Sequence, residues 1–104
     1  MYKPTVELDS NALIHTAQGL KAIAHPVRLA IVGLLEGGES LSVTEIYESL
    51  GLEQAVASQH LAVLRERKIL DASRQGKHTY YSLRHDCITD IIELMLSTLE
   101  NKKR

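Results

Sequence analysis

The sequence predicts a mainly α-helical domain with one small β-hairpin, and three observations support this fold class. The chain has 104 residues, enough for one domain with a single hydrophobic core. It contains no Phe and no Trp, so its core must be built from the aliphatic residues typical of packed helices. Residues 42–68 show two helical patterns joined by a turn at Gly51, and a Gly-centred turn between two strand-like runs follows them.

Residues 1–10 are expected to form an N-terminal arm, and residues 11–104 one folded domain. The arm has mixed polarity and is expected to be loose unless a partner holds it. Asp9 or Ser10 can cap a first helix that runs to about Ala24, because a side-chain oxygen there satisfies a free amide at the helix start. One face of this helix is apolar and carries Leu13, Ala17, Leu20 and Ala24.

A second helix is expected from Val27 to Leu35. His25-Pro26 separates it from the first helix, because the residue before Pro avoids the helical region and Pro fits the first turn of a helix. Apart from Arg28 the segment is nearly all apolar, which indicates burial on most sides and a central place in the core. Gly37-Gly38 ends it.

Residues 42–68 carry the pattern of a helix-turn-helix. Ser42-Val43-Thr44-Glu45 is a capping box that opens a supporting helix extending to Leu50. A second helix, from Gln54 to about Lys68, carries an apolar stripe on one face and polar groups on the other. The stripe consists of Val56, Ala57, Leu61, Val63 and Leu64. Two short helices of this kind predict a DNA-binding motif whose second helix, the reading helix, enters the major groove.

A β-hairpin is expected directly after the reading helix. Leu70–Arg74 and Thr79–Leu83 have strand propensity, and Gln75-Gly76-Lys77-His78 forms a turn between them. The tip is polar and basic, suited to phosphates or a minor groove. A helix-turn-helix followed by such a hairpin is a winged helix, here with about five helices and a two-stranded wing.

The last helix is expected from about Asp86 to Glu100. Its apolar stripe is wide for the end of a small domain that already has a core, and consists of Ile88, Ile91, Ile92, Met95, Leu96 and Leu99. We therefore expect a homodimer formed through the first and last helices. The alternative is that the whole stripe packs within one chain.

The charge distribution supports DNA as the partner although the net charge is only −1. Residues 1–53 hold three cations and seven acids, whereas residues 54–85 hold six cations and two acids. The basic segment therefore coincides with the reading helix and the wing. Phosphate binding needs local positive charge rather than a basic chain. Ordinary solvated surface charge is the alternative interpretation.

Several segments, taken in order, resemble the ArsR family of bacterial winged-helix repressors, also called ArsR/SmtB. They are Ala24–Ile31, Leu41–Ile46, Gln54–Leu64 and the Gly76-Lys77 hairpin leading into Tyr80–Leu83. The resemblance runs from about residue 12 to residue 100. It implies a homodimer that represses transcription by occupying a palindromic operator on double-stranded DNA, with an unidentified effector that releases it.

The candidate DNA-binding residues come from the reading helix and the wing. They are Gln54, Ser58, Gln59, His60, Arg65, Arg74, Gln75, Lys77 and His78. Family members often have an Arg just before the His of this helix, and here Gln59 stands at that position. Glutamine can bond an adenine edge bidentately, so we expect a reading role with a changed base preference. The alternative for His60 is that it props the helix on its neighbours.

Neither familiar metal site of the family is intact, and no cofactor is expected. Ser42 and Thr44 occupy the positions of the Cys-x-Cys pair of arsenic and cadmium sensors, and both are poor soft-metal ligands. At the zinc site of the last helix, His85 and Cys87 could ligate, but Thr98 and Asn101 would not complete the set. A metal held by His85 and Cys87 with help from Glu100 or His15 is an alternative.

Cys87 is the one cysteine, which excludes an intramolecular disulfide. Near a helix start and beside His85 it could be a redox-sensing thiolate, and a structural buried thiol is the alternative.

The remaining observations concern other classes of protein. No apolar run reaches the roughly 18–20 residues that cross a bilayer, and no signal peptide opens the chain, so we expect a soluble cytoplasmic protein. An enzyme is not expected, because Ser58 and His60 point in different directions on a helix and no Gly-rich phosphate loop is present. The competing interpretation is a winged-helix module for protein–protein contact without specific DNA binding.

Overall fold

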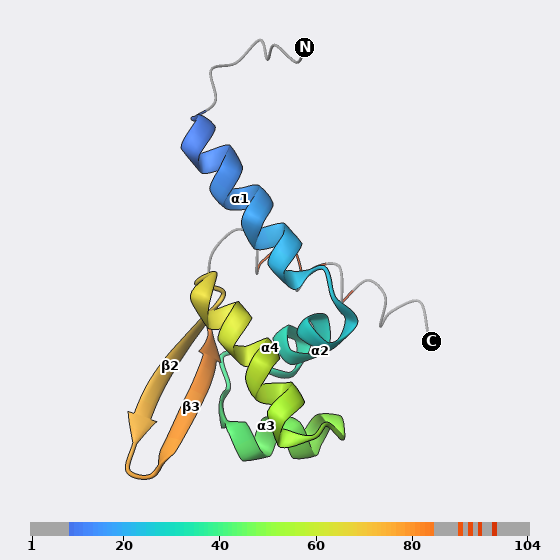
Figure 1. The fold of residues 1–104 in the computed structure, drawn as a ribbon, viewed down its shortest axis with the longest axis vertical. Helices are drawn as coiled ribbons and strands as arrows, with labels where there is room; N and C mark the ends of the chain where they lie inside the picture. The colour runs from blue at the N-terminus through green and yellow to red at the C-terminus, as the bar shows by residue number, and fades with distance from the viewer. Residues whose placement is uncertain (1–8, 85–89, 91, 93, 95–96, 98–104) are drawn as a thin grey trace.

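The computed structural model describes residues 9–84 together with residues 90, 92, 94 and 97. In this part of the chain, four helices form a body from which a β-hairpin projects (Figure 1). The elements are, in order, α1 (Ser10–Ile23), α2 (Pro26–Leu34), β1 (Ser40–Ser42), α3 (Val43–Leu50), α4 (Gln54–Glu66), β2 (Leu70–Gln75) and β3 (His78–Leu83). The mainly helical fold with a wing is confirmed.

Each of the first three helices begins at a side chain that accepts a hydrogen bond from a free backbone amide. Asp9 caps α1 by accepting from the amide of Asn11 at 3.0 Å. His25 caps α2, because its Nδ1 accepts from the amide of Val27 at 3.1 Å. At α3 the predicted capping box is present: Ser42 Oγ accepts from the Glu45 amide, and Glu45 Oε1 accepts from the Ser42 amide.

Two helices end at a residue in the left-handed region. Gly51, with φ of 65°, ends α3 and forms the turn of the helix-turn-helix. After α4, Lys68 adopts φ of 61°, and the Ile69 amide donates to the Leu64 carbonyl at 2.9 Å. This is the hydrogen bond of a Schellman motif, in which glycine usually occupies the position of Lys68. The helix itself ends at Glu66, two residues before the predicted end.

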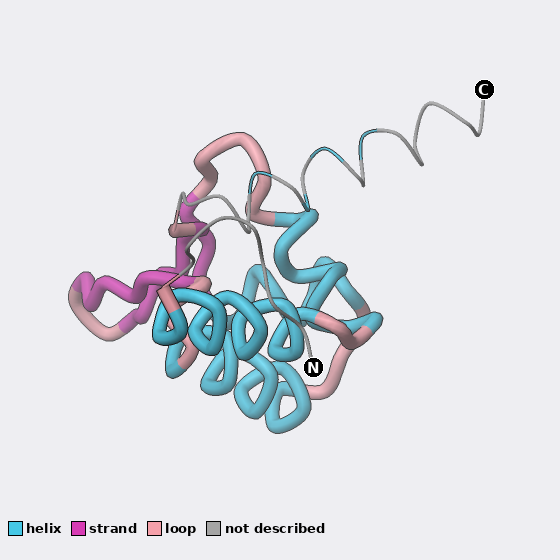
Figure 2. Tube along the Cα trace, turned by 90° about the horizontal axis from the view of Figure 1, so that it is seen from above, coloured by secondary structure: helices cyan, strands magenta, loops and turns pink. Residues whose placement is uncertain are grey.

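The sheet has three antiparallel strands in the order β1-β3-β2, not the two strands expected. β2 and β3 form the predicted hairpin, whose register runs from Leu70 opposite Leu83 to Gln75 opposite His78. Gly76, with φ of 63°, takes the first position of the two-residue turn. β1 adds the extra strand by pairing Ser40–Ser42 with residues 80–82. The sheet lies at one end of the helical body, and the hairpin tip points away from it (Figure 2).

The core is aliphatic, as expected, and draws on every helix and on both hairpin strands. α2 supplies Ile31 and Val32, which are fully buried, in agreement with its predicted central place. Ile46 of α3 and the buried stripe of α4 pack against them. The full cluster is Ala22, Ile23, Ile31, Val32, Leu35, Ile46, Leu61, Leu64, Ile69, Leu70, Leu83 and Ile92.

The apolar face predicted for α1 is exposed rather than packed in the core. Leu13 is 47% exposed and Leu20 45%, whereas Gly19, Ala22 and Ile23 are buried on the opposite side. The expected last helix, residues 86–100, lies mostly outside the described residues. Residues 90, 92, 94 and 97 are each helical, and Ile92 is buried in the core cluster. No helix among the described residues is long and apolar enough to span a bilayer.

Candidate nucleic-acid interface

The two faces of α4 differ as the sequence predicts. Ala57, Leu61 and Leu64 follow one another at four- and three-residue spacing and are fully buried. Gln54, Ser58 and Gln59 are exposed, and so is Arg65 near the end of the helix. These four residues are called the reading face below. They offer amide, hydroxyl and guanidinium groups, the side-chain groups that pair with base edges and phosphates in DNA.

His60 lies on another side of α4, turned toward the start of α2. Its Nδ1 accepts a hydrogen bond from Nε of Arg28 at 3.2 Å, and its ring lies 4.6 Å from the ring of His25, centroid to centroid. Burial, together with the positive charges that His25 and Arg28 can carry, lowers the pKa of His60. A neutral imidazole keeps Nδ1 free to accept from the guanidinium. The structure therefore does not bring His60 onto the reading face.

The hairpin presents its polar groups at its tip, far from the core. Arg74, Gln75, Lys77 and His78 are all exposed, and they are called the wing tip below. The Arg74 Nε donates to the Gly76 carbonyl at 3.4 Å, which holds this side chain over the turn. The rings of His78 and Tyr80 meet edge to face with centroids 6.4 Å apart.

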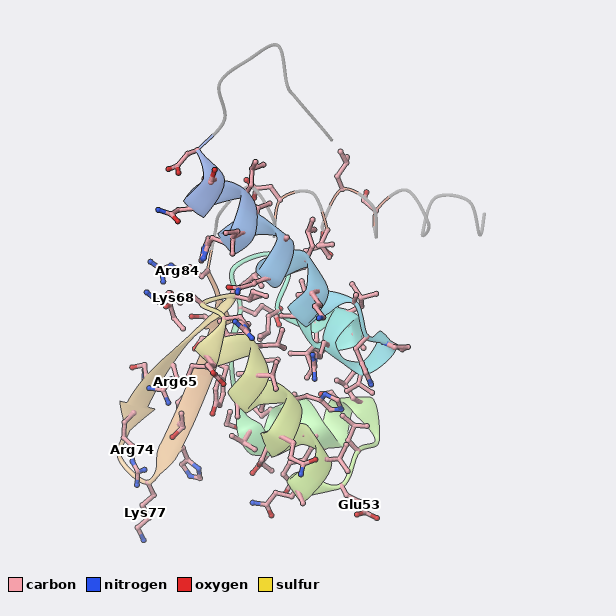
Figure 3. All side chains as sticks on the ribbon, turned by 45° about the horizontal axis from the view of Figure 1, so that its top comes forward. Glu53, Arg65, Lys68, Arg74, Lys77 and Arg84 are labelled. Carbon is pink, nitrogen blue, oxygen red and sulfur yellow. The ribbon has the colours of Figure 1, made fainter. Side chains whose placement is uncertain are left out.

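Positive charge gathers on the side of the molecule that bears the hairpin. Arg74 and Lys77 lie at the tip, Arg65 lies beside the hairpin, and Lys68 and Arg84 lie near its base (Figure 3). Glu53 lies away from them, at the start of α4 (Figure 3). Apart from Arg67, which donates to Gln18 of α1, the cations of the basic segment thus form one cationic side that runs from the reading helix to the wing tip. Such local concentration of cations favours binding of a polyanion.

The sequence did not predict that Arg28 links several elements in this region. The sequence singled it out only as the polar exception in an apolar helix. In the structure, its Nη1 donates to the Ala22 carbonyl at 2.9 Å while its Nε binds His60. It therefore joins the end of α1, the start of α2 and the middle of α4.

The structure tests only some of the predictions about metal sites, because it does not describe all of the residues concerned. No group of three or more His, Cys, Asp or Glu side chains that could hold a metal occurs in the described part of the chain. Ser42 is buried and serves the capping box. His85 and Cys87 lie outside the described residues, as do Thr98 and Asn101, so the predictions for these four stay as made.

Comparison with known proteins agrees with the geometry. A family model described as a helix-turn-helix domain matches residues 23–71, from the end of α1 to the start of β2. The transcriptional repressor PagR of Bacillus anthracis is 39% identical over 86% of this chain and 89% of its own length. The transcriptional regulator YgaV of Escherichia coli K12 is 35% identical over 79% of each chain.

Solved structures show the same fold. The crystal structure of PagR superposes with a TM-score of 0.77 over 84% of this chain and 99% of that chain, at 39% identity. HlyU from Vibrio cholerae superposes with the same TM-score over 85% of this chain and 94% of that chain, at 32% identity. At these identities and coverages, the likeness extends beyond the helix-turn-helix to nearly the whole domain.

Proposed function

The chain belongs to the ArsR family of winged helix-turn-helix DNA-binding transcriptional repressors, and we propose that it binds a palindromic operator as a homodimer. Residues 11–104 form the DNA-binding and dimerisation domain in this proposal. Since a regulator works where its DNA is, a cytoplasmic location is part of the proposal. The observation that carries the proposal is the exposed reading face of α4 beside a cationic wing.

We assign base recognition to the exposed amides and hydroxyl of α4. The side chains of Gln54, Ser58 and Gln59 have no hydrogen bond to the rest of the described chain, so their donors and acceptors are available to a base edge. Arg65, nearly two turns beyond Gln59, is placed to meet a phosphate. His60 is occupied by Arg28, and we therefore assign it to supporting the helix rather than to contacting DNA.

We assign phosphate or minor-groove contact to the wing tip. Arg74 and Lys77 provide charge, while Gln75 and His78 can donate hydrogen bonds. Contacts of this kind position a protein on the duplex without reading its sequence. The wing should therefore add affinity for all DNA, whereas α4 should provide the preference for the operator.

The exposed apolar face of α1 supports the homodimer. Leu13, Ile14 and Leu20 are 45–56% exposed on this one helix, and Leu94 in the C-terminal segment is 70% exposed. Large apolar side chains that are exposed on one helix are typical of an interface. Two-fold dimers of this motif place their reading helices in successive major grooves about 34 Å apart, which calls for a palindromic operator.

Fluorescence-anisotropy binding tests the function directly. The full-length protein is titrated with DNA from upstream of its own gene and with unrelated DNA, over a series of salt concentrations. We expect tight, salt-dependent binding with a clear preference for the upstream DNA. Arg74→Gln and Lys77→Gln should each weaken the binding of both DNAs about equally. Each should also reduce the slope of the logarithm of the binding constant against the logarithm of the salt concentration by about one.

Gln59→Ala should instead change the preference among operator variants, by about 1–3 kcal/mol at one base pair, with little change in the salt slope. Lys21→Gln, which removes the same charge as Lys77→Gln from α1, is the matched control and should leave DNA affinity unchanged. If the Arg74, Lys77 and Gln59 variants all bound DNA with unchanged affinity and unchanged sequence preference, the site assignment would be wrong. Equal, weak binding of both DNAs would favour the competing function of a protein-binding module.

A further inference from the structure

Arg28 is a half-buried cation whose described partners are both neutral. Its Nη1 donates to the Ala22 carbonyl and its Nε to the imidazole of His60. No carboxylate lies within ion-pair distance of it among the residues that the structure describes. Withdrawing a charge from water costs free energy unless an opposite charge compensates it. Two of the five N–H groups of the guanidinium are used, so three remain to bind another acceptor.

A hollow of about 350 Å³ opens beside Arg28, where α1, α2 and α4 meet. It is lined by Gln18, Lys21, Ala22, Arg28, Val63 and Arg67. Three cations from three different segments therefore border one space, and none of the lining residues that the structure describes is acidic. Arg67 is tied to α1 across this region, since its Nη1 donates to Gln18 Oε1 at 3.4 Å.

A neighbouring hollow shows that this charge pattern is not general around α1. That space, of about 170 Å³, is also bordered by Gln18 and Arg67, but Glu66 contributes a carboxylate to its wall. Of the two hollows, the larger combines Arg28 with a wall whose described residues carry no negative charge.

From this juxtaposition we propose that the hollow between α1, α2 and α4 binds a small oxyanion carrying two or more negative charges, such as a phosphate group or a polycarboxylate. The free N–H groups of Arg28 suit bidentate binding of such a group, and Lys21 and Arg67 add charge from either side. Ala22 and Val63 provide apolar wall for a carbon skeleton. The volume lies at the small end of the roughly 300–1,000 Å³ typical of ligand pockets.

The test is an NMR titration of the full-length protein without DNA, so that it stands apart from the proposed repressor function. Backbone amide spectra are recorded during addition of inorganic phosphate, then of citrate, each against sodium chloride at equal ionic strength. We expect saturable shifts centred on residues 18–22, 28 and 67 with phosphate or citrate but not with chloride. Saturation by only one of them identifies the oxyanion chemistry that the hollow prefers.

The variant Lys21→Gln/Arg67→Gln removes two cations from the rim of the hollow and leaves the partly buried Arg28 in place. Each lost charge-assisted hydrogen bond should weaken oxyanion binding about tenfold. Arg74→Gln/Lys77→Gln removes the same two residue types from the wing and should bind the oxyanion as the wild type does. Shifts that do not saturate, that appear equally over the wing, or that survive in the first variant unchanged would overturn the proposal.

Discussion

Replacing His60 with alanine should destabilise the domain by about 2–3 kcal/mol at pH 8. The substitution leaves the half-buried Nε of Arg28 without its acceptor at 3.2 Å. A hydrogen bond to a charged group contributes about 1.5–3 kcal/mol, and the lower end applies because the adjoining hollow lets water reach the guanidinium. Loss of the contact with the His25 ring, at 4.6 Å, adds about 0.5–1.5 kcal/mol.

The assay is urea denaturation followed by circular dichroism, with His15→Ala as the control. His15 is exposed, so its replacement should change the free energy of unfolding by less than about 0.5 kcal/mol. His60→Asn should recover part of the loss, because the Asn carbonyl oxygen can accept from Arg28 where Nδ1 did. If His60→Ala cost no more than His15→Ala, the contact with Arg28 would not support α4, and the reasoning would fail.

The same residue should make stability depend on pH. An imidazole in the unfolded chain titrates near pH 6.5, and burial, then His25 and Arg28, lower the pKa of His60 in the folded chain. The unfolded state therefore takes up this proton first as the pH falls, so the free energy of unfolding should decrease below about pH 6.5. The slope from one such group is at most about 1.4 kcal/mol per pH unit. A slope retained in full by His60→Asn would show that other groups cause it.

Two further predictions concern helix ends, both measured by urea denaturation. Lys68→Gly should raise the free energy of unfolding by about 0.5–1 kcal/mol, because glycine adopts φ of 61° without a Cβ clash. Lys68→Ala keeps the Cβ and should therefore give no such gain. Ser42→Ala should lower the free energy of unfolding by about 1 kcal/mol, because the Glu45 amide loses the hydroxyl that caps it. An unchanged value for Ser42→Ala would contradict the capping role.

The elements defined by local signals were predictable from the sequence. The capping box at Ser42, the glycine turns at Gly51 and Gly76, and the apolar stripe of α4 each act over a few residues, and the structure has all of them. β1 could not be predicted in this way. Ser40–Ser42 is three residues long and becomes a strand only because residues 80–82 lie beside it.

In the candidate site too, features set by local contacts were predictable from the sequence, and features set by distant contacts were not. Exposure of the reading face and the wing tip followed from helical spacing and from the hairpin turn. The position of His60 did not, because it depends on Arg28, 32 residues away in the sequence. The sequence also showed an apolar face on α1, but only the packing of Gly19 and Ile23 reveals that this face points away from the core.

The contacts of α4 separate its support from its recognition surface. Glu53, at its N-terminal cap, makes no capping bond through its side chain, so the helix is held by its buried stripe and by the link from His60 to Arg28. Gln59 makes no such contact with the described chain. A variant of Gln59 should therefore alter DNA preference at unchanged stability, whereas a variant of His60 should lower stability first. Because Arg28 reaches both the Ala22 carbonyl of α1 and the reading helix, a ligand that binds Arg28 acts on both elements at once.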